Sequence, residues 1–128
     1  MEDPTARIAA LSEQIDLCAD AGGRIALLRE RAELEERELA DPARALATRV
    51  ELAALDADDL PNLRDLARIA QRAQDWHLRA TALERIASLV DTPIEVRAAL
   101  TALEEVLRDQ LGDRDRADDV ARRRDEMV

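Results

Sequence analysis

The chain has 128 residues, enough for one domain that buries a core of its own. Its formal net charge is −10, so binding to nucleic acid or to an anionic membrane, which needs dense basic patches, is not expected. Hydrophobic residues make up 47% of the chain but aromatic residues only 1%. Ala, Leu, Ile and Val supply the apolar character, and this composition predicts an all-α fold without a sheet.

The sequence also indicates the cellular compartment and whether a metal or cofactor is expected. No apolar run approaches the ~20 residues of a membrane span and no charged-then-apolar leader opens the chain, so the cytoplasm is the expected compartment. All 19 basic residues are arginine, and this bias, with the many Ala and Asp residues, indicates a GC-rich bacterial genome. The single cysteine, Cys18, cannot build a disulfide, a zinc cluster or a redox pair, and no metal or cofactor is expected.

Helix-start signals recur along the chain. Asp3 and Asp41 each place a capping carboxylate before a proline, and Thr92 with Glu95 forms a capping box. The Gly22-Gly23 pair is expected to separate the first two helices. Between these signals, apolar residues recur every three or four positions. The pattern predicts seven helices, over residues 4–20, 23–39, 42–56, 60–74, 76–90, 93–111 and 114–127.

Aspartates open alternate helices at near-regular intervals. Asp3, Asp41, Asp75 and Asp113 follow one another at spacings of 38, 34 and 38 residues. One helical hairpin per about 34 to 40 residues is typical of a stacked solenoid. We therefore expect a single helical-repeat domain over residues 1–128, with a right-handed α-solenoid fold. It consists of a leading helix, 4–20, and three hairpins, at about 23–56, 60–90 and 93–127.

The best-matching unit is Leu66–Trp76, "LARIAQRAQDW", which resembles the tetratricopeptide repeat (TPR). It has that family's leucine and small residues, followed by the turn that ends in Asp and an aromatic residue, with Gln74 where the family has glycine. Leu111-Gly112-Asp113, followed by Ala117, and Leu39-Ala40-Asp41, followed by Ala45, are similar. The resemblance implies stacked helix hairpins that bind a peptide or protein in a concave groove, without catalysis. Most bulky aromatic positions of the family are Ala, Leu or even Glu35 here.

Trp76 and His77 are the single tryptophan and the single histidine of the chain. Trp76 follows the middle turn, where a large ring fills an elbow otherwise lined by alanines, so a packing role is predicted. His77 is expected to face solvent, and no second His or Cys lies nearby in sequence for metal binding or catalysis. Cys18 falls on the apolar stripe of the first helix and is expected to be buried. The chain is therefore predicted not to be an enzyme.

Arginines recur on the helices that the resemblance places along the concave groove. An arginine-rich groove suits a peptide or protein partner with acidic or C-terminal carboxylate groups. The competing interpretation is ordinary salt bridging with Glu33, Asp65 and Glu105. The candidate groove residues are Arg64, Arg68 and Arg72 in the middle unit and Arg29, Arg37 and Arg108 in the flanking units.

The first helix suggests a different kind of contact. Counting from Asp3, it is the second helix of a hairpin whose first helix is missing, so Ile8, Leu11 and Ile15 are expected to lie partly uncovered. Either the chain is a piece of a longer repeat array, or a homodimer forms through this face. A third alternative, an enzyme or regulatory domain with a small ligand between its helices, predicts a deep, enclosed pocket with converging polar groups.

Overall fold

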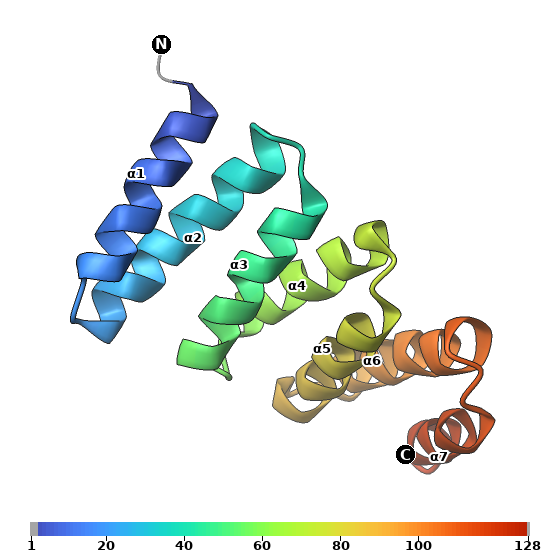
Figure 1. Cartoon of the computed structure of the whole chain (residues 1–128). Helices are drawn as coiled ribbons and strands as arrows, with labels where there is room; N and C mark the ends of the chain where they lie inside the picture. The colour runs from blue at the N-terminus through green and yellow to red at the C-terminus, as the bar shows by residue number, and fades with distance from the viewer. Residues whose placement is uncertain (1–2, 128) are drawn as a thin grey trace. The chain divides into compact units, whose positions relative to one another are not determined.

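In a computed structural model, residues 3–127 are described, and they form seven α-helices, one π-helical segment and no strand (Figure 1). The all-α prediction is confirmed, and most predicted boundaries lie within three residues of the observed ones. The elements are α1 (Pro4–Leu17), α2 (Ala21–Arg37), α3 (Pro42–Leu55), α4 (Leu60–Ala73), α5 (Trp76–Leu89), α6 (Pro93–Glu105), the π-helical segment η1 (Val106–Gln110) and α7 (Arg114–Asp125).

The chain divides into two compact units, of which the first ends at Asn62 and the second begins at Leu63. Helix α4 therefore starts in the first unit and continues into the second. In the first unit α1 packs on α2 and α2 on α3, and in the second α5 packs on α6 and α6 on α7. Successive helices are thus neighbours within each unit, whereas the single domain expected over residues 1–128 stays a prediction.

In the first unit, the core includes Ile15, Leu28 and Leu52, which are all buried. Ile8 and Leu11 belong to the same stripe of α1 as Ile15. These three α1 side chains are 2%, 4% and 5% exposed, so the expectation that Ile8, Leu11 and Ile15 lie partly uncovered is wrong. The reason is that α2 packs on α1 and covers the stripe. A homodimer through this face stays a prediction that these side chains do not support.

The three predicted hairpin elbows share one local structure. In each, a residue with positive φ directly precedes an aspartate whose carboxylate accepts a hydrogen bond from the backbone N–H three residues later. The positive φ ends one helix and the aspartate caps the next. The turns are Ala40-Asp41 (φ 49°), Gln74-Asp75 (φ 59°) and Gly112-Asp113 (φ 64°), and all three N–H to Oδ1 distances are 3.2 Å.

The boundary between the first two helices differs from the prediction. Helix α1 ends at Leu17 and α2 begins at Ala21, so Gly22 and Gly23 lie inside the first turn of α2. Asp20 caps α2, because its Oδ2 accepts from the Gly23 N–H at 2.9 Å. A Cβ atom on Gly23 would lie 2.9 Å from the Cys18 Sγ. Glycine at position 23 therefore leaves room for Cys18, which is half-buried rather than fully buried.

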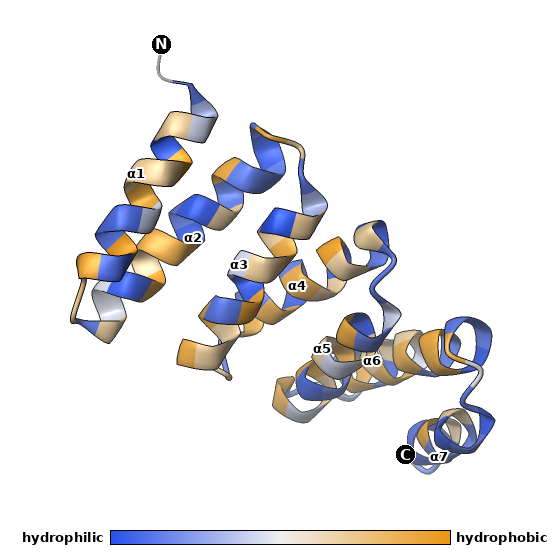
Figure 2. Cartoon of the chain, viewed as in Figure 1, coloured by the Kyte–Doolittle hydropathy of each residue, from blue (hydrophilic) through white to orange (hydrophobic). Residues whose placement is uncertain are grey.

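Figure 2 shows apolar and polar residues alternating along the helices. In the second unit the buried apolar residues lie on α4, α5, α6 and η1. Helix α7 is strongly polar by comparison and buries Ala117 and Val120 against its neighbours. The second unit therefore has an apolar interior that a largely charged last helix covers. Buried apolar residues there include Leu83, Ile86, Leu100, Leu103, Val106 and Leu107.

Candidate functional site

A groove of about 360 Å³ lies among α4, α5 and α6 in the second unit. Its lining combines short or branched apolar side chains with a few charged ones. The apolar lining residues are Ala67, Leu83, Ile86, Val90, Ala98, Ala99 and Ala102, and the polar ones are Arg64, Arg68, Gln71, Arg79 and Glu95.

The sequence makes this groove by placing alanines where two helices would otherwise fill the space between them. Ala98 and Ala102 are one helical turn apart and therefore share a face of α6. On α5, Leu83, Ile86 and Val90 recur at intervals of three and four and form the apolar wall. An alanine side chain ends at Cβ, so the space beyond it stays open.

Two of the arginines that were expected to line a groove do line this one, and both form ion pairs. The Arg64 guanidinium lies 3.8 Å from the Glu95 carboxylate, and Arg68 lies 3.0 Å from Asp65. Because these side chains are about half exposed, such pairs contribute little to stability. The pairing of Arg68 with Asp65 is the salt bridge that the competing interpretation predicts.

Glu95 also departs from the predicted capping box. The Thr92 Oγ1 accepts from the Glu95 N–H at 3.2 Å, which is the first half of that motif. The second half, a bond from the Thr92 N–H back to the Glu95 carboxylate, is absent from the described structure. Instead the carboxylate is directed toward Arg64. Glu95 therefore belongs to the groove rather than to the cap.

The other predicted groove residues lie elsewhere. Arg72 is exposed on α4 and does not line the groove. Arg29 and Arg37 belong to the first unit: Arg29 donates to Asp59 at 2.5 Å, which raises the pKa of Arg29, and Arg37 pairs with Glu33 at 3.2 Å. The structure therefore brings Arg64 and Arg68 together in one groove but does not bring Arg29, Arg37 or Arg72 to it.

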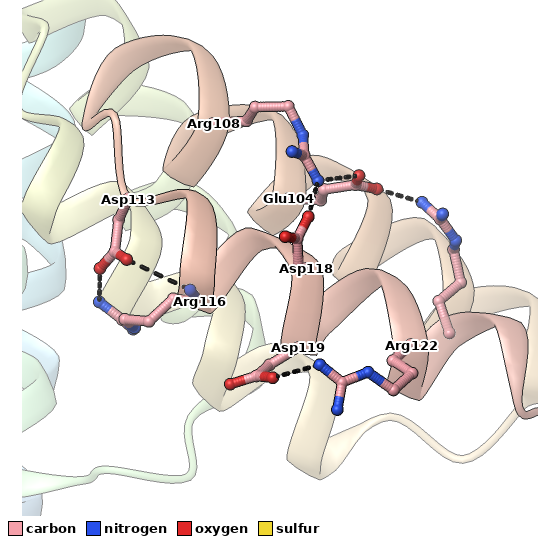
Figure 3. A network of polar contacts seen from close by, with 8 residues as sticks. Glu104, Arg108, Asp113, Arg116, Asp118, Asp119 and Arg122 are labelled. Carbon is pink, nitrogen blue, oxygen red and sulfur yellow. Dashed lines mark hydrogen bonds and ion pairs between the residues drawn. The ribbon is translucent and has the colours of Figure 1, made fainter.

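Arg108 belongs to a network of ion pairs that holds α7 (Figure 3). It donates to Glu104 and to Asp118, both at 3.0 Å, and Arg124 donates to Glu104 at 2.5 Å. The hydrogen bond from Arg108 is the main cause of the lowered pKa of Glu104. The expected partner, Glu105, is replaced by its neighbour Glu104. Arg108 thus contacts carboxylates of α6 and α7 and does not line the groove.

Arg79 also lines the groove, although its place in the sequence pattern did not predict this. Its side chain is half-buried on α5, its Nη1 donates to the Ala67 carbonyl of α4 at 2.8 Å, and burial lowers the pKa of its guanidinium. Four residues after the capping aspartate, the other two hairpins have Ala45 and Ala117, whereas this hairpin has Arg79.

A second polar cluster lies in the first unit around Glu35, one of the positions where the family resemblance expects a bulky side chain. Glu35 is buried, accepts a hydrogen bond from the Thr48 hydroxyl and lies 3.7 Å from Arg44. Burial raises the pKa of Glu35. Because its carboxylate is bound by residues of α3, this cluster connects α2 to α3 and leaves no open face for a ligand.

The single tryptophan and the single histidine are half-buried or exposed. Trp76 is half-buried at the first position of α5, in agreement with a packing role, and His77 is exposed as expected. Within residues 3–127, no three His, Cys, Asp or Glu side chains are grouped to hold a metal ion. In the same range no helix is both long and apolar enough to cross a membrane.

No protein-family profile, curated protein or solved structure matches the chain.

Proposed function

We propose that this chain is a non-catalytic, TPR-like solenoid of stacked hairpins that holds a peptide segment of a protein partner. The binding surface in this proposal is the groove of α4, α5 and α6. The observation that carries it is the combination in one groove of an apolar wall with arginines at positions 64, 68 and 79. Peptide sites in proteins commonly join apolar pockets for side chains to a few charged groups that fix orientation.

The recurring elbow supports the repeat part of the proposal. A residue with positive φ and a capping aspartate return at Asp41, Asp75 and Asp113, at the spacings that the repeat interpretation requires. Recurrence of one turn at a near-regular interval is typical of stacked helical repeats. The handedness of the stack and the membership of the TPR family belong to the proposal.

Charge supports an acidic partner segment. The groove is lined by three arginines and one glutamate, whereas the whole chain carries a net charge of −10. An acidic protein that concentrates cations in one apolar groove offers a local site for carboxylates. In the proposal, aliphatic side chains of the partner contact Leu83 and Ile86, and its carboxylates face the arginines. The groove is open, whereas the small-ligand alternative predicts a deep, enclosed pocket.

The experiment is a capture of partners from the source cell with the wild-type chain beside Arg64→Glu/Arg68→Glu. The matched control is Arg122→Glu/Arg123→Glu, which makes the same charge change on α7, away from the groove. Loss of captured proteins in the first variant alone supports the proposal. The same captured set with all three chains contradicts it.

A further inference from the structure

Arg79 takes the place of a buried alanine. In all three hairpins the residue four positions after the capping aspartate donates its backbone N–H to the carbonyl of that aspartate, at 3.1 Å for Ala45, 3.0 Å for Arg79 and 3.0 Å for Ala117. The three positions are therefore equivalent in local structure. Ala45 and Ala117 are 0% exposed, so the elbow itself calls for a small side chain. The longer side chain of Arg79 instead reaches the Ala67 carbonyl of α4 and lines the groove.

The Arg79 guanidinium is placed to receive an anion. Its Nη1 is fixed by the Ala67 carbonyl at 2.8 Å, and the residue lines the groove beside Leu83 and Ile86. Among residues 3–127, no carboxylate forms a contact ion pair with it, and Glu105 acts on it only from a longer distance. Arg64 and Arg68, by contrast, each have a carboxylate at the rim.

Burial next to apolar side chains makes the charged form of the Arg79 guanidinium unfavourable when no anion is bound. Desolvation lowers the pKa of the guanidinium, because the charged form loses water contacts. A carboxylate that enters the groove replaces that water with a charge-assisted hydrogen bond, which is strong in a partly desolvated place. A neutral amide of the same shape gives a weaker bond. The position therefore favours an anion over its neutral isostere.

We infer that Arg79 is the residue that selects an acidic side chain in the partner peptide, directly beside an aliphatic side chain that contacts Leu83 and Ile86. The ligand class is a peptide segment in which Glu or Asp stands next to Leu, Ile or Val. This inference rests on the proposed function and specifies the chemistry of the peptide that binds in the groove. Arg64 and Arg68 attract the acidic segment at the rim, and Arg79 discriminates between carboxylate and amide inside the groove.

The test uses the full chain and two pools of capped pentapeptides. In one pool a central Glu is flanked by Leu or Val, and in the other Gln replaces Glu. Binding is followed by backbone amide shifts and by the Nε–H signal of Arg79. We expect the wild-type chain to bind the Glu pool about tenfold more tightly than the Gln pool, since a charge-assisted bond is stronger than a neutral one.

Two substitutions distinguish a role of Arg79 in selecting Glu over Gln from a role in stabilising the fold. Arg79→Ala reproduces the residue of the other two hairpins and so keeps the elbow, and Arg79→Met keeps most of the side-chain volume without the charge. Both variants should keep the wild-type thermal stability or exceed it, bind the Gln pool as before, and lose the preference for Glu. A structural role would instead appear as a lower stability with the preference intact.

The outcomes separate this inference from the proposed function. Equal binding of the Glu and Gln pools by the wild-type chain overturns the role of Arg79 and leaves the groove as a peptide site. A preference for Glu that survives in Arg79→Met also overturns that role. If neither pool binds the wild-type chain, the proposed function and the inference both fail.

Discussion

The carboxylate of Glu95 lies 3.8 Å from the guanidinium of Arg64 at the groove, although the backbone N–H of Glu95 is held by the Thr92 cap. The residue is thus fixed at the start of α6 while its charge faces a groove arginine. A carboxylate of the chain itself occupies a position that a partner carboxylate would otherwise use. Under the proposed function, Glu95 therefore competes with the acidic partner for Arg64.

Replacement of this competitor should strengthen binding. Glu95→Gln removes the negative charge at the rim, so Arg64 becomes available to a partner carboxylate. The affinity for the Glu pool of peptides should rise by up to about fivefold, since an exposed pair contributes at most about 1 kcal/mol. Glu84→Gln is the control, because Glu84 pairs with Arg116 at 3.5 Å, is similarly exposed and does not line the groove. Equal affinities for the two variants would exclude competition by Glu95.

The positive φ angles in the turns predict how two substitutions, one that introduces glycine and one that removes it, change the stability of the chain. Gln74 has a φ of 59° and Gly112 a φ of 64°, a region in which a Cβ is unfavourable. Gln74→Gly should therefore stabilise the chain by up to about 1 kcal/mol, and Gly112→Ala should destabilise it by about 1 kcal/mol. Urea denaturation measures both changes.

The control for these turns is a glycine in a helix. Gly22 lies in the first turn of α2 without a positive φ, and a Cβ there would approach Asp20 no closer than 3.4 Å. Gly22→Ala should thus stabilise the chain by up to about 1 kcal/mol through helix propensity. If Gly22→Ala and Gly112→Ala change stability in the same direction, the left-handed turn does not determine the effect.

Glu35 predicts a pH dependence of stability. Burial raises its pKa in the folded chain, so the folded chain keeps this proton to a higher pH than the unfolded chain does. The stabilisation from this proton is present below the ordinary glutamate pKa and is lost as pH rises through the raised pKa. The free energy of unfolding of Glu35→Gln, relative to wild type, should therefore increase as the pH rises above the ordinary glutamate pKa of about 4.3. A flat or falling difference would contradict the burial of this carboxylate.

The lowered pKa of Glu104 predicts a pH dependence of stability that is opposite to that of Glu35. The hydrogen bond from Arg108, together with that from Arg124, lowers the pKa of Glu104, so its contribution is present above the ordinary glutamate pKa and is lost as pH falls. Glu104→Gln should be less stable than wild type at neutral pH, and the difference should shrink on acidification. Hydrogen exchange on α7 reports the same change, because Glu104 holds that helix. Unchanged protection of α7 in the variant would show that the network does not hold it.

The sequence predicted the helices well because their signals are local. Capping residues such as Asp41, Asp75 and Thr92 satisfy backbone N–H groups within one turn, so neither the second unit nor any distant contact is needed to place them. The exception is Gly22-Gly23, where the cap at Asp20 prevailed over the tendency of glycine to end a helix. A strong cap acts at one position, whereas a low helix propensity only weakens a helix.

The candidate site was predicted only in part, because it depends on which helix faces which. Arg64 and Arg68 were selected by their spacing on one helix face, and the groove contains them. The family resemblance also places Arg108 along the groove, but in the structure Arg108 donates to Glu104 and Asp118. Spacing along one helix does not reveal the carboxylates of the next. The sequence pattern does not point to Arg79, because this position holds arginine after Asp3 and Asp75 but alanine after Asp41 and Asp113, and only the structure shows that Arg79 lines the groove.

Intermolecular methyl NOEs between the full chain and a bound peptide from the Glu pool locate the peptide-binding surface directly. A peptide bound in the groove should show contacts from its aliphatic side chain to Leu83, Ile86 and the alanines at 98 and 102. Contacts confined to α1 or α7, with none to these methyl groups, would contradict binding in the groove.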